Sequence, residues 1–121
     1  MSVRAKTASA KAARQAATLR SSAAVFAALG DETRLRLVAA LCAGSAMSIA
    51  QLTAGTDITR QSVTQHLQVL AEAGLVHDVK VGRERLWAFE PTHLDAARRA
   101  LDALSRQWDQ ALLKLKMMVE E

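Results

Sequence analysis

The apolar residues near the end of the chain repeat with the alternating three- and four-residue spacing of a coiled-coil seam. This spacing continues for about seven helical turns. A small domain cannot cover so long an apolar stripe, so residues 92–121 are predicted to form a helix that pairs with a second copy. The seam comprises Leu94, Ala97, Leu101, Leu104, Trp108, Ala111, Leu115 and Met118. Leu112 on the same helix, with Val25 and Phe26 of an earlier helix, completes the expected homodimer interface.

The length of 121 residues allows one small domain. Its net charge of +4 arises in residues 1–20, which hold five basic residues and no acid. The other 11 basic residues are outnumbered by 12 acidic ones, so overall basicity does not show that the folded part binds nucleic acid. We expect residues 1–20 to form a flexible, partly helical basic arm. A mitochondrial transit peptide, which is also rich in Ala, Ser and Arg, has a similar composition.

Several classes of protein are disfavoured by what the sequence lacks. No apolar run approaches ~18 residues, so no membrane insertion is expected. The single cysteine, Cys42, cannot form a disulfide within the chain, which favours a reducing, cytoplasmic location. We expect its side chain to be buried at a helix end. There is no nucleotide-binding loop and no nucleophile–histidine–carboxylate set, so the chain is predicted not to be an enzyme and has no candidate catalytic residues.

Glycines and capping residues divide residues 21–74 into helices, with helical periodicity beginning at Ser21. The expected stops are Gly30, Gly44, Gly55 and Gly74. The expected N-caps are Asp31, Thr59 and Ser48, the last in a capping box with Gln51. The helix after Thr59 carries a core stripe of Val63, Leu67 and Leu70. Two short helices joined by a turn predict a helix-turn-helix.

The pattern changes to period two after Gly74. Val79 and Val81 alternate with polar residues, Gly82-Arg83 turns the chain, and a second alternating run continues to Phe89. This arrangement predicts a β-hairpin, which directly after a helix-turn-helix forms the wing of a winged helix. Pro91 ends the hairpin, and Thr92 with Asp95 resembles a further capping box. The predicted fold is therefore mainly α with a small β-hairpin: a winged helix-turn-helix over residues 21–91, dimeric through its terminal helices.

The helix after Thr59 is predicted to read double-stranded DNA. With its core stripe buried, its outward face carries Arg60, Gln61, Thr64, Gln65 and Gln68. Arginine pairs with guanine and glutamine with adenine, and no acid lies between Arg60 and Ala71 to repel phosphate. Further candidate contacts are Ser48, Thr59, Ser62 and His66, and Lys80, Arg83 and Arg85 on the wing; for His66 packing is the alternative role. A winged helix that contacts another protein, or a helix whose polar face is only solvated, would show part of the same pattern.

Three segments of the chain resemble the ArsR/SmtB repressors. Phe26–Leu37 looks like their first signature, Thr59–Val76 resembles their recognition helix almost position by position, and Gly82–Trp87 resembles their wing. The resemblance implies a homodimeric winged-helix repressor that binds a palindromic operator until an inducer lowers its DNA affinity.

Many members of that family sense metals, so their ligand positions can be compared with this chain. Ser48-Ile49-Ala50 stands where the thiolate sensors have Cys-x-Cys, and the last helix offers His93 and Asp95 with no second histidine. We therefore expect no metal site and no cofactor, a metal-responsive repressor with an atypical site being the alternative. Gln107-Trp108-Asp109 resembles the metal-independent, SdpR-like branch, for which the inducer is a small molecule or a protein.

Overall fold

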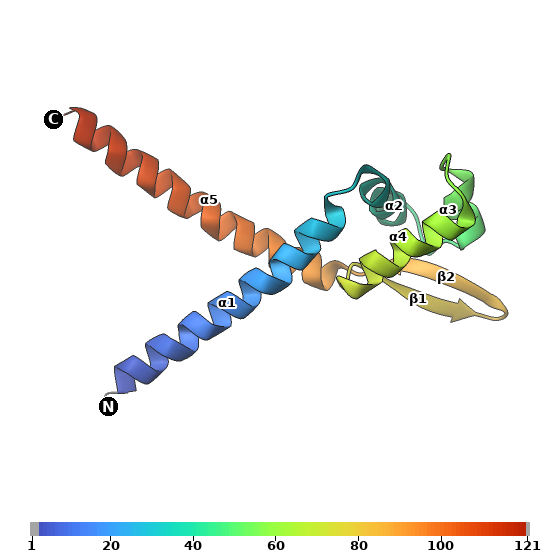
Figure 1. Ribbon diagram of the computed structural model, residues 1–121, viewed down its shortest axis with the longest axis horizontal. Coiled ribbons are helices and arrows are strands. Elements are labelled where there is room, and N and C mark those ends of the chain that lie inside the picture. Colours follow the sequence, from blue (N-terminus) through green and yellow to red (C-terminus); the bar gives the residue numbers. More distant parts are fainter. Residues whose placement is uncertain (1–2, 121) are drawn as a thin grey trace.

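The computed structural model describes residues 3–120, with the side chains of residues 6–120. Within this range seven elements follow one another along the chain (Figure 1). They are α1 (Val3–Leu29), α2 (Glu32–Ala43), α3 (Ile49–Ala54), α4 (Arg60–Glu72), β1 (Val76–Val81), β2 (Glu84–Phe89) and α5 (Pro91–Glu120). Four helices, an antiparallel hairpin and a last helix make a winged helix-turn-helix, so the predicted fold class is confirmed.

The two longest helices, α1 and α5, cross one another and extend away from the other elements (Figure 1). The helix-turn-helix and the hairpin gather at the opposite end of the molecule. The core lies where these parts meet and consists of Val25, Ala28, Leu37, Val38, Leu41, Leu52, Val63, Leu67, Leu70, Leu75, Val76, Trp87 and Ala97. Among residues 3–120, no helix combines the length and apolar character needed to cross a membrane.

Local hydrogen bonds set the helix starts as the sequence predicts. Asp31 Oδ2 accepts the backbone N–H of Arg34 at 2.9 Å, and Thr59 Oγ1 accepts that of Ser62 at 3.1 Å. Ser48 and Gln51 form the reciprocal capping box. These side chains satisfy backbone donors that the first helical turn leaves unpaired, so three N-caps are confirmed.

The hairpin has the predicted turn at Gly82, whose φ of +62° suits glycine. Its register pairs Val81 with Glu84 and Val76 with Phe89. Trp87 is 5% exposed at the base of the hairpin, where its backbone also pairs with Met47 in front of α3. The hairpin is thus attached to the helix-turn-helix at two places. β2 pairs with Met47 before α3, and β1 follows directly after α4.

Two predicted helix starts differ from those observed. α1 begins at Val3 and passes through Ser21 without a break, because the alanine-rich sequence before Ser21 favours helix as strongly as the sequence after it. The Thr92–Asp95 capping box is also wrong. Pro91 occupies the first helical position of α5, and Glu90 caps it: Glu90 Oε1 accepts the N–H of Thr92 at 3.2 Å and its hydroxyl at 2.6 Å.

Three predicted burial states also need correction. Cys42 is exposed, because Leu41 takes the inward position on α2 and the next side chain points away from the core. Val25 and Ala97 were expected at a homodimer interface, yet they are 2% and 0% exposed within one protomer. Both side chains are buried in the core of one protomer, where α1 packs against α5. They therefore offer almost no surface to a second copy.

Candidate nucleic-acid interface

Helix α4 buries one face and offers the other to solvent. Val63, Leu67 and Leu70 are 0% exposed in the core. On the opposite face Arg60, Gln61, Gln65 and Gln68 are exposed and Thr64 is half-buried. The first acid on α4 is Glu72, its last residue, so the exposed face offers hydrogen-bonding groups without negative charge.

The hydroxyl groups around α4 are engaged with the helix itself. Thr59 Oγ1 caps α4 and donates to Ser62 Oγ at 3.2 Å, while Thr64 Oγ1 donates to the carbonyl of Arg60 at 2.8 Å. Ser48 likewise caps α3, its side chain accepting the backbone N–H of Gln51. Ser48, Thr59 and Ser62 lie at helix N-termini, where unpaired N–H groups and the helix dipole favour an anion. Their hydroxyls hold the helix ends in shape in the absence of DNA.

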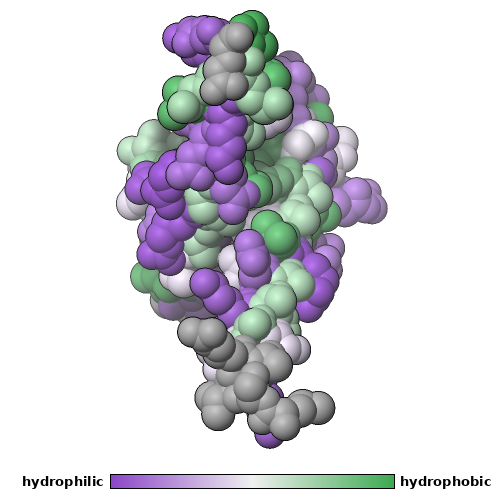
Figure 2. All heavy atoms as spheres, turned by 90° about the vertical axis from the view of Figure 1, so that its left-hand side faces the viewer, coloured by the Kyte–Doolittle hydropathy of each residue, from purple (hydrophilic) through white to green (hydrophobic). Residues whose placement is uncertain are grey.

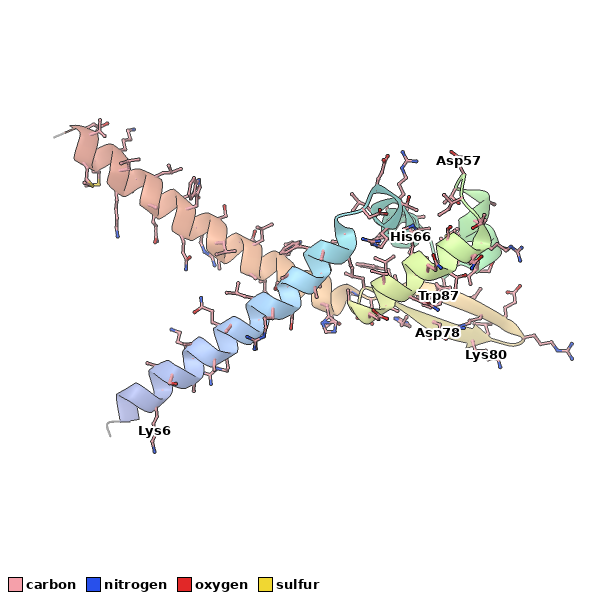
Figure 3. The ribbon with its side chains drawn as sticks, viewed as in Figure 1. Lys6, Asp57, His66, Asp78, Lys80 and Trp87 are labelled. Carbon is pink, nitrogen blue, oxygen red and sulfur yellow. The ribbon has the colours of Figure 1, made fainter. Side chains whose placement is uncertain are left out.

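His66 points away from the exposed face of α4 (Figure 3). It is half-buried, with Nδ1 3.4 Å from Arg34 Nη1 and 4.0 Å from Asp31 Oδ2. Of the two roles that the sequence left open, the geometry favours packing over phosphate contact. Contact of His66 with DNA therefore has less structural support than packing. Sequence reasoning also missed Arg34, because no periodicity links residues 32 positions apart.

The three basic residues of the wing differ in availability. Arg85 Nε donates to Asp78 Oδ2 at 2.8 Å, and its guanidinium lies 5.2 Å from the centre of the Trp87 ring. Lys80 and Arg83 are exposed and have no ion-pair partner among the described residues (Figure 3 labels Lys80 and Asp78). Lys80 and Arg83 are therefore better placed than Arg85 to contact a phosphate.

Two carboxyl groups near these elements have lowered pKa values. The backbone N–H of Arg34 lowers the pKa of Asp31, with a smaller contribution from the charge of the Arg34 guanidinium. The hydroxyl and backbone N–H of Thr92 lower the pKa of Glu90. Both groups are helix caps, so their charge is tied to the ends of α2 and α5.

The part of the chain that the structure describes holds no group of three or more His, Cys, Asp or Glu side chains placed to bind a metal ion together. His93 lies against Gly74: a Cβ on Gly74 would come 2.2 Å from His93 Cδ2. The imidazole of His93 therefore packs on the glycine that ends α4.

The protruding helix α5 exposes much of its apolar seam. Trp108 is 66% exposed, Leu104 48% and Met118 73%. Figure 2 looks at the protruding ends of α1 and α5 and shows apolar side chains open to solvent beside hydrophilic ones. Exposed large hydrophobic residues in this number mark a surface that associates with another protein.

Comparisons with known proteins agree on one kind of protein. A family model described as a helix-turn-helix domain matches residues 29–79. The HTH-type transcriptional regulator Rv2034 of Mycobacterium tuberculosis is 35% identical over 103 residues, covering 85% of this chain and 92% of that protein. An ArsR-like transcriptional regulator from Rhodococcus sp. RHA1 has a solved structure with 35% identity and a TM-score of 0.76, covering 84% of this chain and 95% of its own.

A further solved structure is described as homodimeric. It is the winged helix-turn-helix DNA-binding domain of Mb0332 from Mycobacterium bovis, a possible ArsR-family transcriptional regulator. Its sequence is 26% identical, its TM-score is 0.62, and the match covers 84% of this chain and 89% of that one.

Proposed function

Because this chain belongs to the ArsR family of winged helix-turn-helix transcriptional regulators, we propose that it is a sequence-specific repressor that binds a palindromic operator as a homodimer. A non-metal inducer or partner releases it from the DNA. In this proposal residues 21–91 read the DNA and residues 92–121 join the two copies.

The observation that carries the proposal is the exposed face of α4. Arginine at position 60 and glutamines at positions 61, 65 and 68 supply the bidentate donors and acceptors that distinguish guanine and adenine in the major groove. The core stripe fixes which side of the helix faces outward. Lys80 and Arg83 supply the phosphate contacts that hold the domain on the duplex.

The homodimer is supported by the apolar surface of α5 and by the homodimeric relative from Mycobacterium bovis. Leu101, Leu104, Leu112, Leu115 and Trp108 are each between 47% and 66% exposed in one protomer. A second copy that covers them removes this surface from water. Of the two α1 residues expected at this interface, Phe26 remains available, since it is 40% exposed.

The non-metal inducer is supported by what occupies the metal-sensor positions. Ser48 is engaged in the capping box of α3, and Ala50 has no side-chain atom that can bind a metal. His93 is packed against Gly74. A closed metal site needs about four N, S or O ligands, and these positions supply too few within one chain.

Selection from a random duplex library tests the proposal. The full chain is incubated with the library at ~150 mM salt and bound duplexes are amplified over several rounds. We expect enrichment of an inverted repeat whose half-sites are ~10 bp apart centre to centre. A Gln65→Ala variant should lose base preference at one position in each half-site. A final pool with the base composition of the input would contradict the proposal.

A further inference from the structure

Three polar side chains join the end of α1 and the start of α2 to the recognition helix. They are Asp31 and Arg34 from the α1–α2 junction and His66 from α4, and we call them the polar clasp. We propose that the polar clasp sets the position of α4 for base reading, with neutral His66 accepting a hydrogen bond from Arg34. His66 and Arg34 are then positioning residues that act through α4. This inference rests on the DNA-reading role proposed for α4.

Arg34 is held firmly by the end of α1. Its Nε donates to the carbonyl of Ala28 at 2.6 Å, and its Nη2 donates to that of Ala27 at 3.5 Å. Both carbonyls belong to the last turn of α1, and that of Ala27 also accepts the backbone N–H of Gly30 at 3.2 Å. The guanidinium therefore satisfies the helix terminus and complements its negative dipole end. Its third nitrogen, Nη1, remains free to face α4.

The contact with His66 fixes which tautomer the clasp uses. Arginine is always protonated and can only donate, so His66 Nδ1 must accept at the 3.4 Å separation from Nη1. The proton of the neutral ring then lies on Nε2. Asp31 Oδ2 lies 4.0 Å from the same Nδ1 and already accepts the backbone N–H of Arg34. Arg34 is thus hydrogen-bonded to the end of α1 and faces His66 of α4 with the same guanidinium.

The contact between α1 and α4 beside the clasp is formed on the α1 side by small side chains. A groove of about 510 Å³ separates the two helices and is lined largely by alanines, with Arg34 at its edge. The α1 wall consists of alanines, whereas Val69, Glu72 and Ala73 form the α4 wall, so the α1 side restrains the sliding and rotation of α4 less than larger side chains would. A directional hydrogen bond restrains both. Because base contacts need placement within about 0.5 Å, loss of this bond should affect reading more than folding.

A matched pair of variants tests the role of His66. Asn Oδ1 lies near the place of Nδ1, so His66→Asn keeps an acceptor for Arg34, whereas His66→Leu removes it at similar volume. Affinity is measured for a duplex that the wild-type chain selects from a random library and for a scrambled duplex. We expect His66→Asn to remain within about 2-fold of wild type, and His66→Leu to bind the selected duplex about 10-fold more weakly with unchanged affinity for the scrambled one.

Two results would overturn the clasp. One is an unchanged ratio of the two affinities in His66→Leu. The other is an equal loss in His66→Asn, because His66 itself would then be the group that contacts DNA.

An NMR measurement on the wild-type chain tests whether His66 Nδ1 accepts a hydrogen bond from Arg34. It needs neither DNA nor a destabilised variant. Long-range ¹H–¹⁵N correlation at about pH 8, where a free imidazole is neutral, reports which ring nitrogen carries the proton. Comparison with His66→Asn identifies the signals of His66. We expect the Nε2–H tautomer, with Nδ1 unprotonated. Protonation on Nδ1, or an equal mixture, would overturn the clasp, whereas failure of the library selection alone would overturn the proposed function.

Discussion

Replacement of Gly74 by alanine tests how the end of the recognition helix is joined to α5. Gly74 has a φ of +77°, a conformation that costs an L-residue about 1–2 kcal/mol. Its new Cβ would also lie 2.2 Å from His93 Cδ2 and 2.8 Å from Nε2. His93 is exposed and its ring can move aside, so we assign this overlap about 1–2 kcal/mol of lost packing and rotamer strain. The expected loss of unfolding free energy in Gly74→Ala is about 3 kcal/mol in total.

Gly82 provides a matched control for the backbone contribution alone. Its φ is +62°, and a Cβ added there meets no atom within 4 Å. Gly82→Ala should therefore cost about 1–2 kcal/mol. In a His93→Ala background the overlap disappears, so the cost of Gly74→Ala should fall to the same value.

Urea denaturation followed by circular dichroism measures these differences at one protein concentration, since dimer stability depends on concentration. The reasoning predicts a coupling energy of about 1–2 kcal/mol between positions 74 and 93. Equal costs for Gly74→Ala in the wild-type and His93→Ala backgrounds would refute the contact. Equal costs for the two glycines would do the same.

Four further predictions follow from the interface, the caps and the proposed inducer. Gln65→Ala should lose about 1–3 kcal/mol of binding free energy for the selected duplex only. Arg83→Ala should instead weaken binding to all duplexes and reduce the slope of log affinity against log salt concentration by about 1. Identical titrations of the two variants would contradict these roles. Trp108→Ala should weaken the dimer by roughly 2 kcal/mol or about 30-fold, and unchanged sedimentation on dilution would argue against the α5 interface. The pKa of Glu90 is lowered below its ordinary 4.5 by Thr92, so its contribution to stability is present above that value and is lost as pH falls through the lowered pKa. The stability of Glu90→Gln, measured by thermal melts, should therefore fall less than that of wild type between about pH 5 and 3. Equal falls in the two proteins would exclude a contribution from the Glu90 cap. Chelation with EDTA and addition of Zn²⁺ should each leave DNA affinity within about 2-fold, and a metal-dependent change would contradict the non-metal inducer.

Features set by residues close in sequence could be predicted. Asp31, Ser48 and Thr59 each accept the N–H of the residue three positions ahead, so these caps can be predicted from four consecutive residues. The core stripe of α4 follows from helical periodicity alone. The hairpin follows from alternation on both sides of Gly82, where positive φ favours glycine.

Features that depend on how the helices meet could not be predicted. The clasp joins Arg34 to His66 across 32 positions, and a helical period gives no information about such a contact. The burial of Val25 and Ala97 likewise results from the crossing of α1 and α5, although each residue fits an interface pattern on its own helix. Arg85 could be placed on the wing, but its ion pair with Asp78 depends on the strand register. The start of α1 was missed because helix propensity continues through the alanine-rich segment without a stop.

The central claim, that the exposed face of α4 reads a DNA sequence, is tested most directly by one affinity ratio. Fluorescence anisotropy at ~150 mM salt measures the dissociation constants of the selected duplex and of a scrambled duplex with the same composition. The account predicts a ratio of at least ~10³ in favour of the selected duplex. A ratio near one would contradict it and leave only the salt-dependent attraction of a basic chain for phosphate.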